Sequence, residues 1–135
     1  MAGDQPVPLG LILEIFAEPL FALGQDTGKG GHPIIRIVGR SLAEPLPFID
    51  ELLAEEFHPV TARFAQAMRR HVAYLSPEDY LWRLSFVIGA MQHTLVTMHR
   101  MKDLTRGICS DHDHAGALRR FVQFAALTLT APAVS

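Results

Sequence analysis

The sequence is short of cysteine and lacks any long hydrophobic run. Cys109 is the single cysteine among 135 residues, so no disulfide can form within one chain, which fits a reducing compartment. No apolar run approaches the roughly 18 residues that a membrane-spanning helix needs. The first residues, MAGDQPVP, lack the basic and then apolar pattern of a signal peptide. We therefore expect a soluble, cytoplasmic protein.

Charge is also scarce. Charged residues make up 19% of the chain and hydrophobic residues 49%, whereas about a quarter charged is usual for a soluble domain. The net charge of -2 gives no basic signature for nucleic-acid binding. A chain this apolar is expected to bury surface against a partner or around an apolar ligand.

Apolar residues recur at spacings of three and four along the chain, which predicts helices rather than strands. Proline and glycine clusters divide the sequence into five segments. We therefore predict an all-α domain of about five helices over residues 9–132, preceded by an extension or linker of residues 1–8. A kink or break is expected at Pro19, and a bend near His58 is expected in the long helix of residues 47–75.

The last two long helices are apolar on more than one side. The first of them begins with Ser76-Pro77-Glu78-Asp79, which combines an N-cap serine, a first-turn proline and two acids. It then carries two apolar faces, and residues 115–131 are apolar nearly all round. Helices of this kind are buried between neighbours. We expect the pair to pack against its own copy as a four-helix interface with two-fold symmetry.

Enzyme signatures are absent from the sequence. It contains no G-x-S-x-G, no H-E-x-x-H and no glycine-rich phosphate loop after a strand. We therefore expect a protein that is not an enzyme and that holds no cofactor.

Residues 110–114, Ser-Asp-His-Asp-His, allow two interpretations. Serine and aspartate are preferred caps and first-turn residues of a helix. The alternative is a metal-dependent enzyme built on this cluster. On a helix, His112 and His114 would point to different faces, and further ligands would have to come from elsewhere. Capping is the favoured interpretation, with no metal ligand assigned; the alternative site would use Asp111, His112, Asp113 and His114, with His99 as a further ligand.

Three short elements in a fixed order resemble a known family. They are G-R-x-L-x-E-P at 39–45, E-E-F-H-P-V at 55–60, and W-x3-F-x2-G-x3-H at 82–93. Together with the stretches around them, these elements are similar to the C-terminal regulatory domain of tetracycline-repressor-type transcriptional regulators. The likeness runs from about Pro8 to Pro132.

The resemblance implies a ligand-sensing and dimerisation domain of a bacterial regulator. In the family, the bent long helix and its neighbours enclose an apolar pocket, and the last two long helices pair with their copies. The family's DNA-binding helix-turn-helix head should precede this domain, but only eight residues precede Leu9. The partners implied are therefore a second copy and a small apolar or amphipathic effector, and this chain by itself should not bind DNA specifically.

Ligand pockets are mostly apolar with a few polar anchors, and this guides the choice of site residues. For any single position, ordinary core packing remains the alternative, and a ligand-free helical interaction module remains an alternative function. The expected pocket residues are Phe57, Phe64, Met68, Trp82, Phe86, Gly89 and His93. The expected dimer-interface residues are Met91, Leu95, Met98, Phe121, Phe124, Ala125 and Thr128.

Overall fold

The computed structural model describes residues 7–24, 40, 51, 55 and 58–134 of the chain. Within this part all regular structure is helical, which confirms the all-α expectation. The α-helices are α1 (Leu9–Gly24), α4 (His58–Arg69), α5 (Pro77–Thr97), α6 (Met101–Leu104) and α7 (His114–Thr130), with 3-10 helices at Arg70–Val72 and Met98–Arg100.

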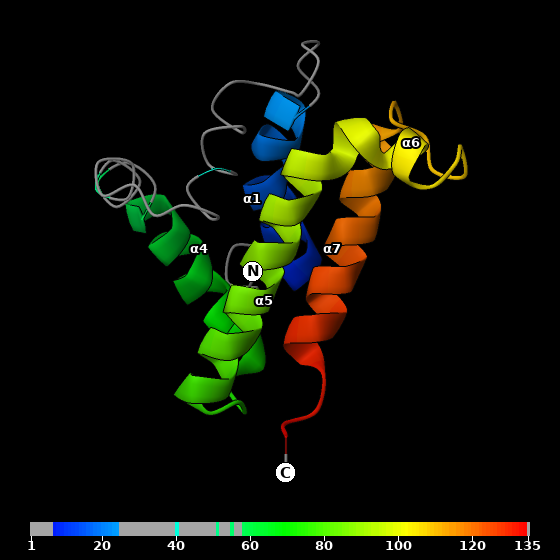
Figure 1. Cartoon of the computed structure of the whole chain (residues 1–135). Helices are drawn as coiled ribbons and strands as arrows, with labels where there is room; N and C mark the ends of the chain where they lie inside the picture. The colour runs from blue at the N-terminus through cyan, green and yellow to red at the C-terminus, as the bar shows by residue number, and fades with distance from the viewer. Residues whose placement is uncertain (1–6, 25–39, 41–50, 52–54, 56–57, 135) are drawn as a thin grey trace.

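The two longest helices, α5 and α7, lie side by side and run in opposite directions (Figure 1). Helix α1 packs behind them and makes its most extensive contact with α7, while α4 lies along the other side of α1 and α5. No helix among the described residues is long and apolar enough to cross a membrane.

Helix α5 begins where its sequence predicts. The hydroxyl oxygen of Ser76 accepts a hydrogen bond from the backbone N–H of Asp79 at 3.1 Å, and Pro77 occupies the first helical position. This cap satisfies one of the N–H groups that a helix start leaves without a partner.

Helix α1 continues through Pro19 without the break that was one of the two outcomes expected there. Proline removes the hydrogen bond to the carbonyl group four residues earlier, at Ile15. Both residues are exposed, so that carbonyl lies on the solvent side of the helix, where water can bond to it. The second of the five expected segments and the first part of the long helix of residues 47–75 lie largely outside the described residues.

The hydrophobic core lies between α1, α5 and α7. Phe21 of α1 and Phe121 of α7 place their ring centroids 5.6 Å apart, within the range of favourable aromatic pairs. Each of these three helices contributes an apolar stripe at helical spacing, and Met68, Val72 and Leu75 from α4 and the residues after it belong to the same core. The stripes are Leu13, Ala17 and Phe21 of α1, Leu84, Val87, Met91 and Leu95 of α5, and Phe121, Ala125 and Leu129 of α7.

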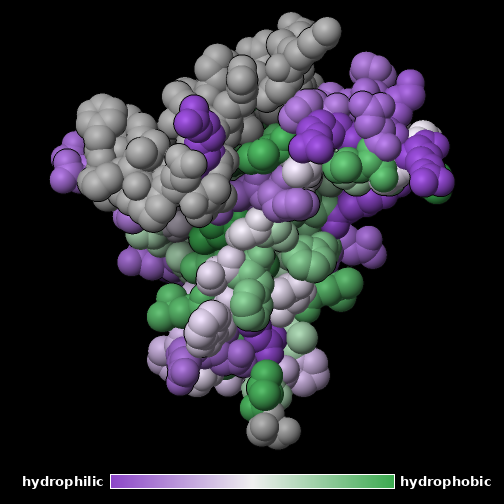
Figure 2. All heavy atoms as spheres, viewed as in Figure 1, coloured by the Kyte–Doolittle hydropathy of each residue, from purple (hydrophilic) through white to green (hydrophobic). Residues whose placement is uncertain are grey.

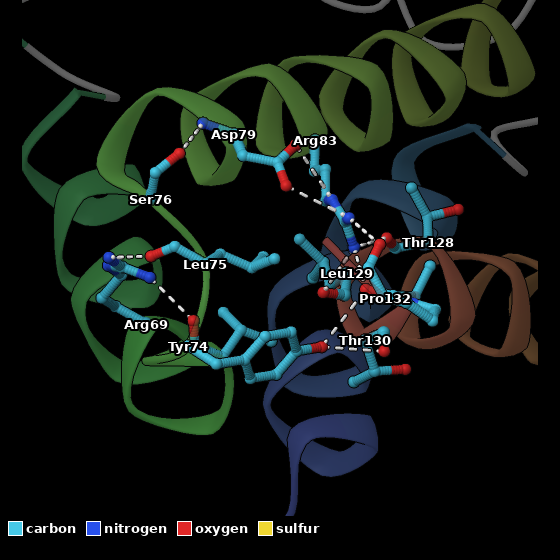
Figure 3. Close-up of polar contacts among 12 residues, drawn as sticks. Arg69, Tyr74, Leu75, Ser76, Asp79, Arg83, Thr128, Leu129, Thr130 and Pro132 are labelled. Carbon is cyan, nitrogen blue, oxygen red and sulfur yellow. Dashed lines mark hydrogen bonds and ion pairs between the residues drawn. The ribbon is translucent and has the colours of Figure 1, made fainter. Parts of the chain in front are cut away.

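A polar cluster fixes the C-terminal end of α7 to the start of α5 (Figure 3). The guanidinium of Arg83 is buried, pairs with Asp79 at 3.2 Å and donates hydrogen bonds to backbone carbonyl groups at the end of α7. The Tyr74 hydroxyl donates to the carbonyl of Thr130 at 2.8 Å. Carbonyl groups at a helix C-terminus have no partner within the helix, and a cation there is favoured by the helix dipole. The carbonyls that accept from Arg83 are those of Thr128, Leu129, Ala131 and Pro132.

Candidate functional site

Helix α5 has an inner face and an outer face, and both are apolar. The inner face, which includes Leu84 and Met91, is buried against α1 and α7. The outer face exposes Trp82 by 58% and Phe86 by 56%. Figure 2 shows pale and green side chains down the centre of the view, over α5 and α7, whereas purple side chains gather around α6.

The structure places most of the expected dimer-interface residues inside the chain itself. Each of these residues is at most 6% exposed, so none offers more than a small part of its side chain to a partner. The physical reason is α1, because it covers the side of α5 and α7 that the sequence analysis assigned to a second copy. The residues are Met91, Leu95, Met98, Phe121 and Ala125.

The remaining two expected interface residues lie toward the outer side of α7. Phe124 is 48% exposed, and Thr128, one turn further, is half-buried. The outer side of α5 carries those expected pocket residues that belong to this helix, and all four are exposed. Periodicity places residues in rows but does not show which row faces inward. The exposed row on α5 consists of Trp82, Phe86, Gly89 and His93.

A small apolar pocket lies between α1, α4 and α5. Its volume is about 10 Å³, which is close to the space of one water molecule. Phe64 and Met68, both expected pocket residues, line it, and the Phe64 ring lies 4.9 Å from that of Phe16. Phe57, also expected there, lies outside the described residues. The rest of the lining is Leu13, Thr61, Leu84, Val87, Ile88 and Met91.

A larger groove of about 760 Å³ lies where the second half of α5 faces the first half of α7. Met98 and Phe121 lie on its apolar floor, and His93 and Arg120 are exposed beside it. The loop before α7 completes one wall. The groove therefore combines apolar surface with a few polar groups, as ligand and partner sites do.

The Ser110–His114 stretch caps α7, as the sequence favoured. The Asp113 carboxylate accepts a hydrogen bond from the backbone N–H of Gly116 at 2.9 Å. A Cβ atom at position 116 would lie 2.1 Å from that carboxylate, so a larger residue there would require the Asp113 side chain to shift. The Asp111 carboxylate lies 3.2 Å from Nε2 of His112. In the described part of the chain, no three His, Cys, Asp or Glu side chains converge on a point that could hold a metal ion.

His114 is the first residue of α7, and its pKa is lowered from 6.5. Burial is the main cause because it disfavours the charged form, and the neighbouring His112 adds to the effect. The carboxylates of Asp111 and Asp113 act in the opposite direction. This histidine therefore takes up a proton less readily in the folded chain than in the unfolded chain.

A family model described as the tetracyclin repressor-like, C-terminal domain matches residues 14–126. The chain belongs to this family. The family is that of transcription regulators, and the all-α fold agrees with it. Neither the curated proteins nor the solved structures give a significant match to the chain.

Within this tetracycline-repressor-like domain, sequence reasoning did not identify Arg83. The residue stands in an apolar helix, and its bonds reach carbonyl groups 45 to 49 residues later. The spacing of four between Asp79 and Arg83 was the one signal available, because such pairs meet on a helix surface. That signal indicates an ion pair but not the C-terminal carbonyl groups that the guanidinium binds.

Proposed function

We propose that this chain is the effector-sensing and homodimerisation domain of a bacterial tetracycline-repressor-type regulator, acting in the cytoplasm. The observation that carries the proposal is the exposed apolar outer face of α5 and α7. Large exposed apolar patches on soluble domains mark interaction sites. The domain regulates rather than catalyses, and DNA contact falls to a helix-turn-helix domain of the full-length regulator.

The outer face has the composition of an interface core. Trp82 and Phe86 stack with ring centroids 5.9 Å apart, and Phe124 on the neighbouring helix is 48% exposed. Aromatic side chains dominate the energetics of protein interfaces. Because α5 and α7 are long and antiparallel, two copies can bury these rings as a four-helix bundle. The dimer surface thus proposed is the row that includes Trp82, Phe86 and Phe124, and not the buried row that includes Met91 and Leu95.

The small pocket between α1, α4 and α5 is proposed as the place where an effector enters. Its walls are apolar apart from Thr61, which favours a small apolar or amphipathic compound. The pocket borders Met91 and Val87 on the inner face of α5. An effector that expands the pocket would therefore push against the same helix that carries the dimer surface.

The dimer proposal is tested with two matched charge substitutions. Phe86→Asp places a carboxylate on the outer face. Leu104→Asp is the control, because it places a carboxylate on α6, away from that face, at a leucine that is also 56% exposed. We expect sedimentation velocity at micromolar concentration to show a dimer for the unchanged protein and for Leu104→Asp, and a folded monomer for Phe86→Asp. A monomeric unchanged protein would refute the proposal.

The pocket proposal is tested with an apolar fluorescent probe, N-phenyl-1-naphthylamine, which is larger than the pocket and can bind there only if the pocket expands. We expect saturable binding of no more than one probe per chain. Thr61→Ile adds volume at the pocket wall and should weaken this binding, whereas Ala62→Ile, one residue along on the exposed side of α4, should leave it intact. Equal probe binding by both variants would place the probe elsewhere.

A further inference from the structure

The groove of about 760 Å³ lies apart from the small pocket that is proposed for the effector. It opens between the second half of α5 and the first half of α7, at the end of the molecule that carries α6 (Figure 1). The small pocket is bounded by α1, α4 and α5, and none of the described residues lines both spaces. The volume of the groove falls within the range of sites for small organic molecules, so it is large enough to be a second binding site.

One side of the groove is apolar and aromatic. Met98 and Phe121 form its floor, and each is at most 6% exposed. Phe124 lines the groove and is 48% exposed. The face of an aromatic ring carries partial negative charge and attracts a cation that lies over it. This side can therefore hold the apolar body of a ligand, and its rings favour a positive charge.

The hydroxyl groups on the α5 wall of the groove already have hydrogen-bond acceptors. The Thr94 hydroxyl donates to the carbonyl of Ala90 at 2.7 Å, and the Thr97 hydroxyl donates to the carbonyl of His93 at 2.8 Å. An apolar group can cover a hydroxyl that is bonded back to its own helix without breaking that bond. The choice of ligand therefore falls to the charged groups of the opposite wall.

Two carboxylates and one guanidinium line the groove, and all three belong to α7 or to the loop before it. They are those of Asp111, Asp113 and Arg120. Nη1 of Arg120 lies 3.7 Å from Oδ2 of Asp113, and Oδ1 of Asp113 accepts the hydrogen bond from Gly116 that caps α7. The guanidinium and the Asp113 carboxylate thus compensate each other, which leaves the charge of Asp111.

Asp111 has no permanently charged partner in the part of the chain that the structure describes. Its side chain is 26% exposed, and its Oδ1 is shut off from water and accepts no hydrogen bond. Nε2 of His112 lies 3.2 Å from this oxygen, but the imidazole is charged only when protonated, and its side chain is 88% exposed. A carboxylate that is poorly hydrated and lacks a donor gains more from a nearby cation than a fully hydrated one does.

The other ionisable groups around the groove do not supply the missing positive charge. Burial lowers the pKa of His114 from 6.5, so this imidazole is neutral at pH 7. The basic residues around α6 are exposed and do not line the groove, so water and salt screen their charges. These residues are Arg100, Lys102 and Arg106.

We infer that the groove binds an organic cation with an apolar, aromatic body, whose charge lies beside Asp111 and whose body packs on the apolar floor and on Phe124. A single chain supplies every residue of this site, so the site does not depend on the proposed dimer. It also lies outside the proposed effector pocket. The domain therefore has room for a second small molecule, and the charge of that molecule is defined.

The charge of the ligand is tested with two ions of the same shape. Tetraphenylphosphonium and tetraphenylborate have the same apolar rings and differ in the sign of their charge. Isothermal titration calorimetry at about pH 8, where an ordinary imidazole is neutral, measures the binding of each ion to the whole chain. We expect the phosphonium to bind at least about tenfold more tightly than the borate. Equal affinities, or tighter binding of the borate, would overturn the inference.

Asp111→Asn removes the charge without changing the size of the side chain, and it should weaken phosphonium binding about tenfold. Asp103→Asn is the matched control, because Asp103 is exposed on α6 and does not line the groove. This control should leave binding unchanged. Unchanged binding by Asp111→Asn would overturn the inference.

A variant of the small pocket separates this inference from the effector proposal. Thr61→Ile adds volume at the wall of that pocket and should leave phosphonium binding unchanged. Loss of phosphonium binding in this variant would place the cation in the small pocket and would overturn the inference, whereas the effector proposal would stand.

One wall of the groove belongs to the outer face of α5 and α7, so a second copy could cover it. Phe86→Gln removes a ring of that face without adding a charge, and this variant is titrated at a concentration where sedimentation velocity shows a monomer. We expect this monomer to bind the phosphonium. Absence of binding in both the unchanged protein and this monomer would overturn the inference.

Discussion

Nη2 of Arg83 lies 2.6 Å from the carbonyl oxygen of Pro132, which joins the start of α5 to the chain just after α7. Nη1 of the same guanidinium lies 2.5 Å from the carbonyl oxygen of Ala131. The side chain is buried and also pairs with Asp79. One arginine therefore holds together the two helices that form the proposed dimer face.

Arg83→Met should lower the free energy of unfolding by about 2–4 kcal/mol, because it leaves buried carbonyl groups and the Asp79 carboxylate without their donor. Arg83→Lys should keep only part of the unfolding free energy that Arg83→Met loses, since an ammonium group lacks the planar arrangement of donors that a guanidinium has. Urea unfolding followed by circular dichroism measures both. Arg119→Met, at an exposed position of α7, is the control and should change stability little. An equally small loss for Arg83→Met would show that the bonds to α7 contribute little.

Leu95→Ala should destabilise the folded chain rather than weaken association. Leu95 is 5% exposed inside the core, so truncation leaves a cavity and should cost about 2–5 kcal/mol of unfolding free energy. Leu81→Ala is the matched control, because Leu81 is 62% exposed on the same helix. Its effect on unfolding should be small. If Leu95→Ala instead dissociated the dimer without loss of stability, the buried row would be the interface after all.

Gly89→Leu should leave the chain folded and weaken the dimer. A Cβ at this position meets no atom of the described residues within 4 Å, and leucine forms helix better than glycine by up to about 1 kcal/mol. Gly89 lies in the exposed row of α5 that the proposed dimer would bury, so the leucine would push the two copies apart. We expect the dissociation constant from sedimentation equilibrium to rise about tenfold or more, which corresponds to at least ~1.4 kcal/mol.

The control for Gly89→Leu is Ala62→Leu, which adds a similar side chain at an exposed position of α4. It should leave the dissociation constant unchanged. A tight dimer with Gly89→Leu would show that α5 is not crossed at this point.

Acidification should destabilise the chain partly through His114. Its pKa is lowered from 6.5 in the folded state, so below that value the unfolded chain binds the proton more readily. Stability therefore falls as the pH drops from about 6.5 toward the lower folded pKa, and the loss is constant below both values. His114→Asn should flatten this part of a plot of Tm against pH.

At pH above about 7, where the histidine is neutral in both states, the pH dependence of the variant and the unchanged protein should be the same. The measurement is differential scanning calorimetry from about pH 5 to pH 8, which covers this range. Parallel profiles throughout would mean that His114 contributes nothing to the acid sensitivity.

The sequence alone determined the helical period of the chain and the starts of α5 and α7. The Ser76 cap, the Asp113 cap and the spacing of apolar residues act within a few residues of each other, so local chemistry is sufficient to predict them. The ordered motifs also indicated the tetracycline-repressor-like family, which the family model then showed.

Only the tertiary structure decided which side of each helix faces inward. Two apolar rows on α5, one through Met91 and one through Phe86, look alike in the sequence, and the position of α1 buries the first and exposes the second. The bonds of Arg83 and the groove beside Phe124 likewise depend on residues more than twenty positions apart. Helical periodicity gives the spacing of a row, but the direction in which the row points is set by packing against the rest of the chain.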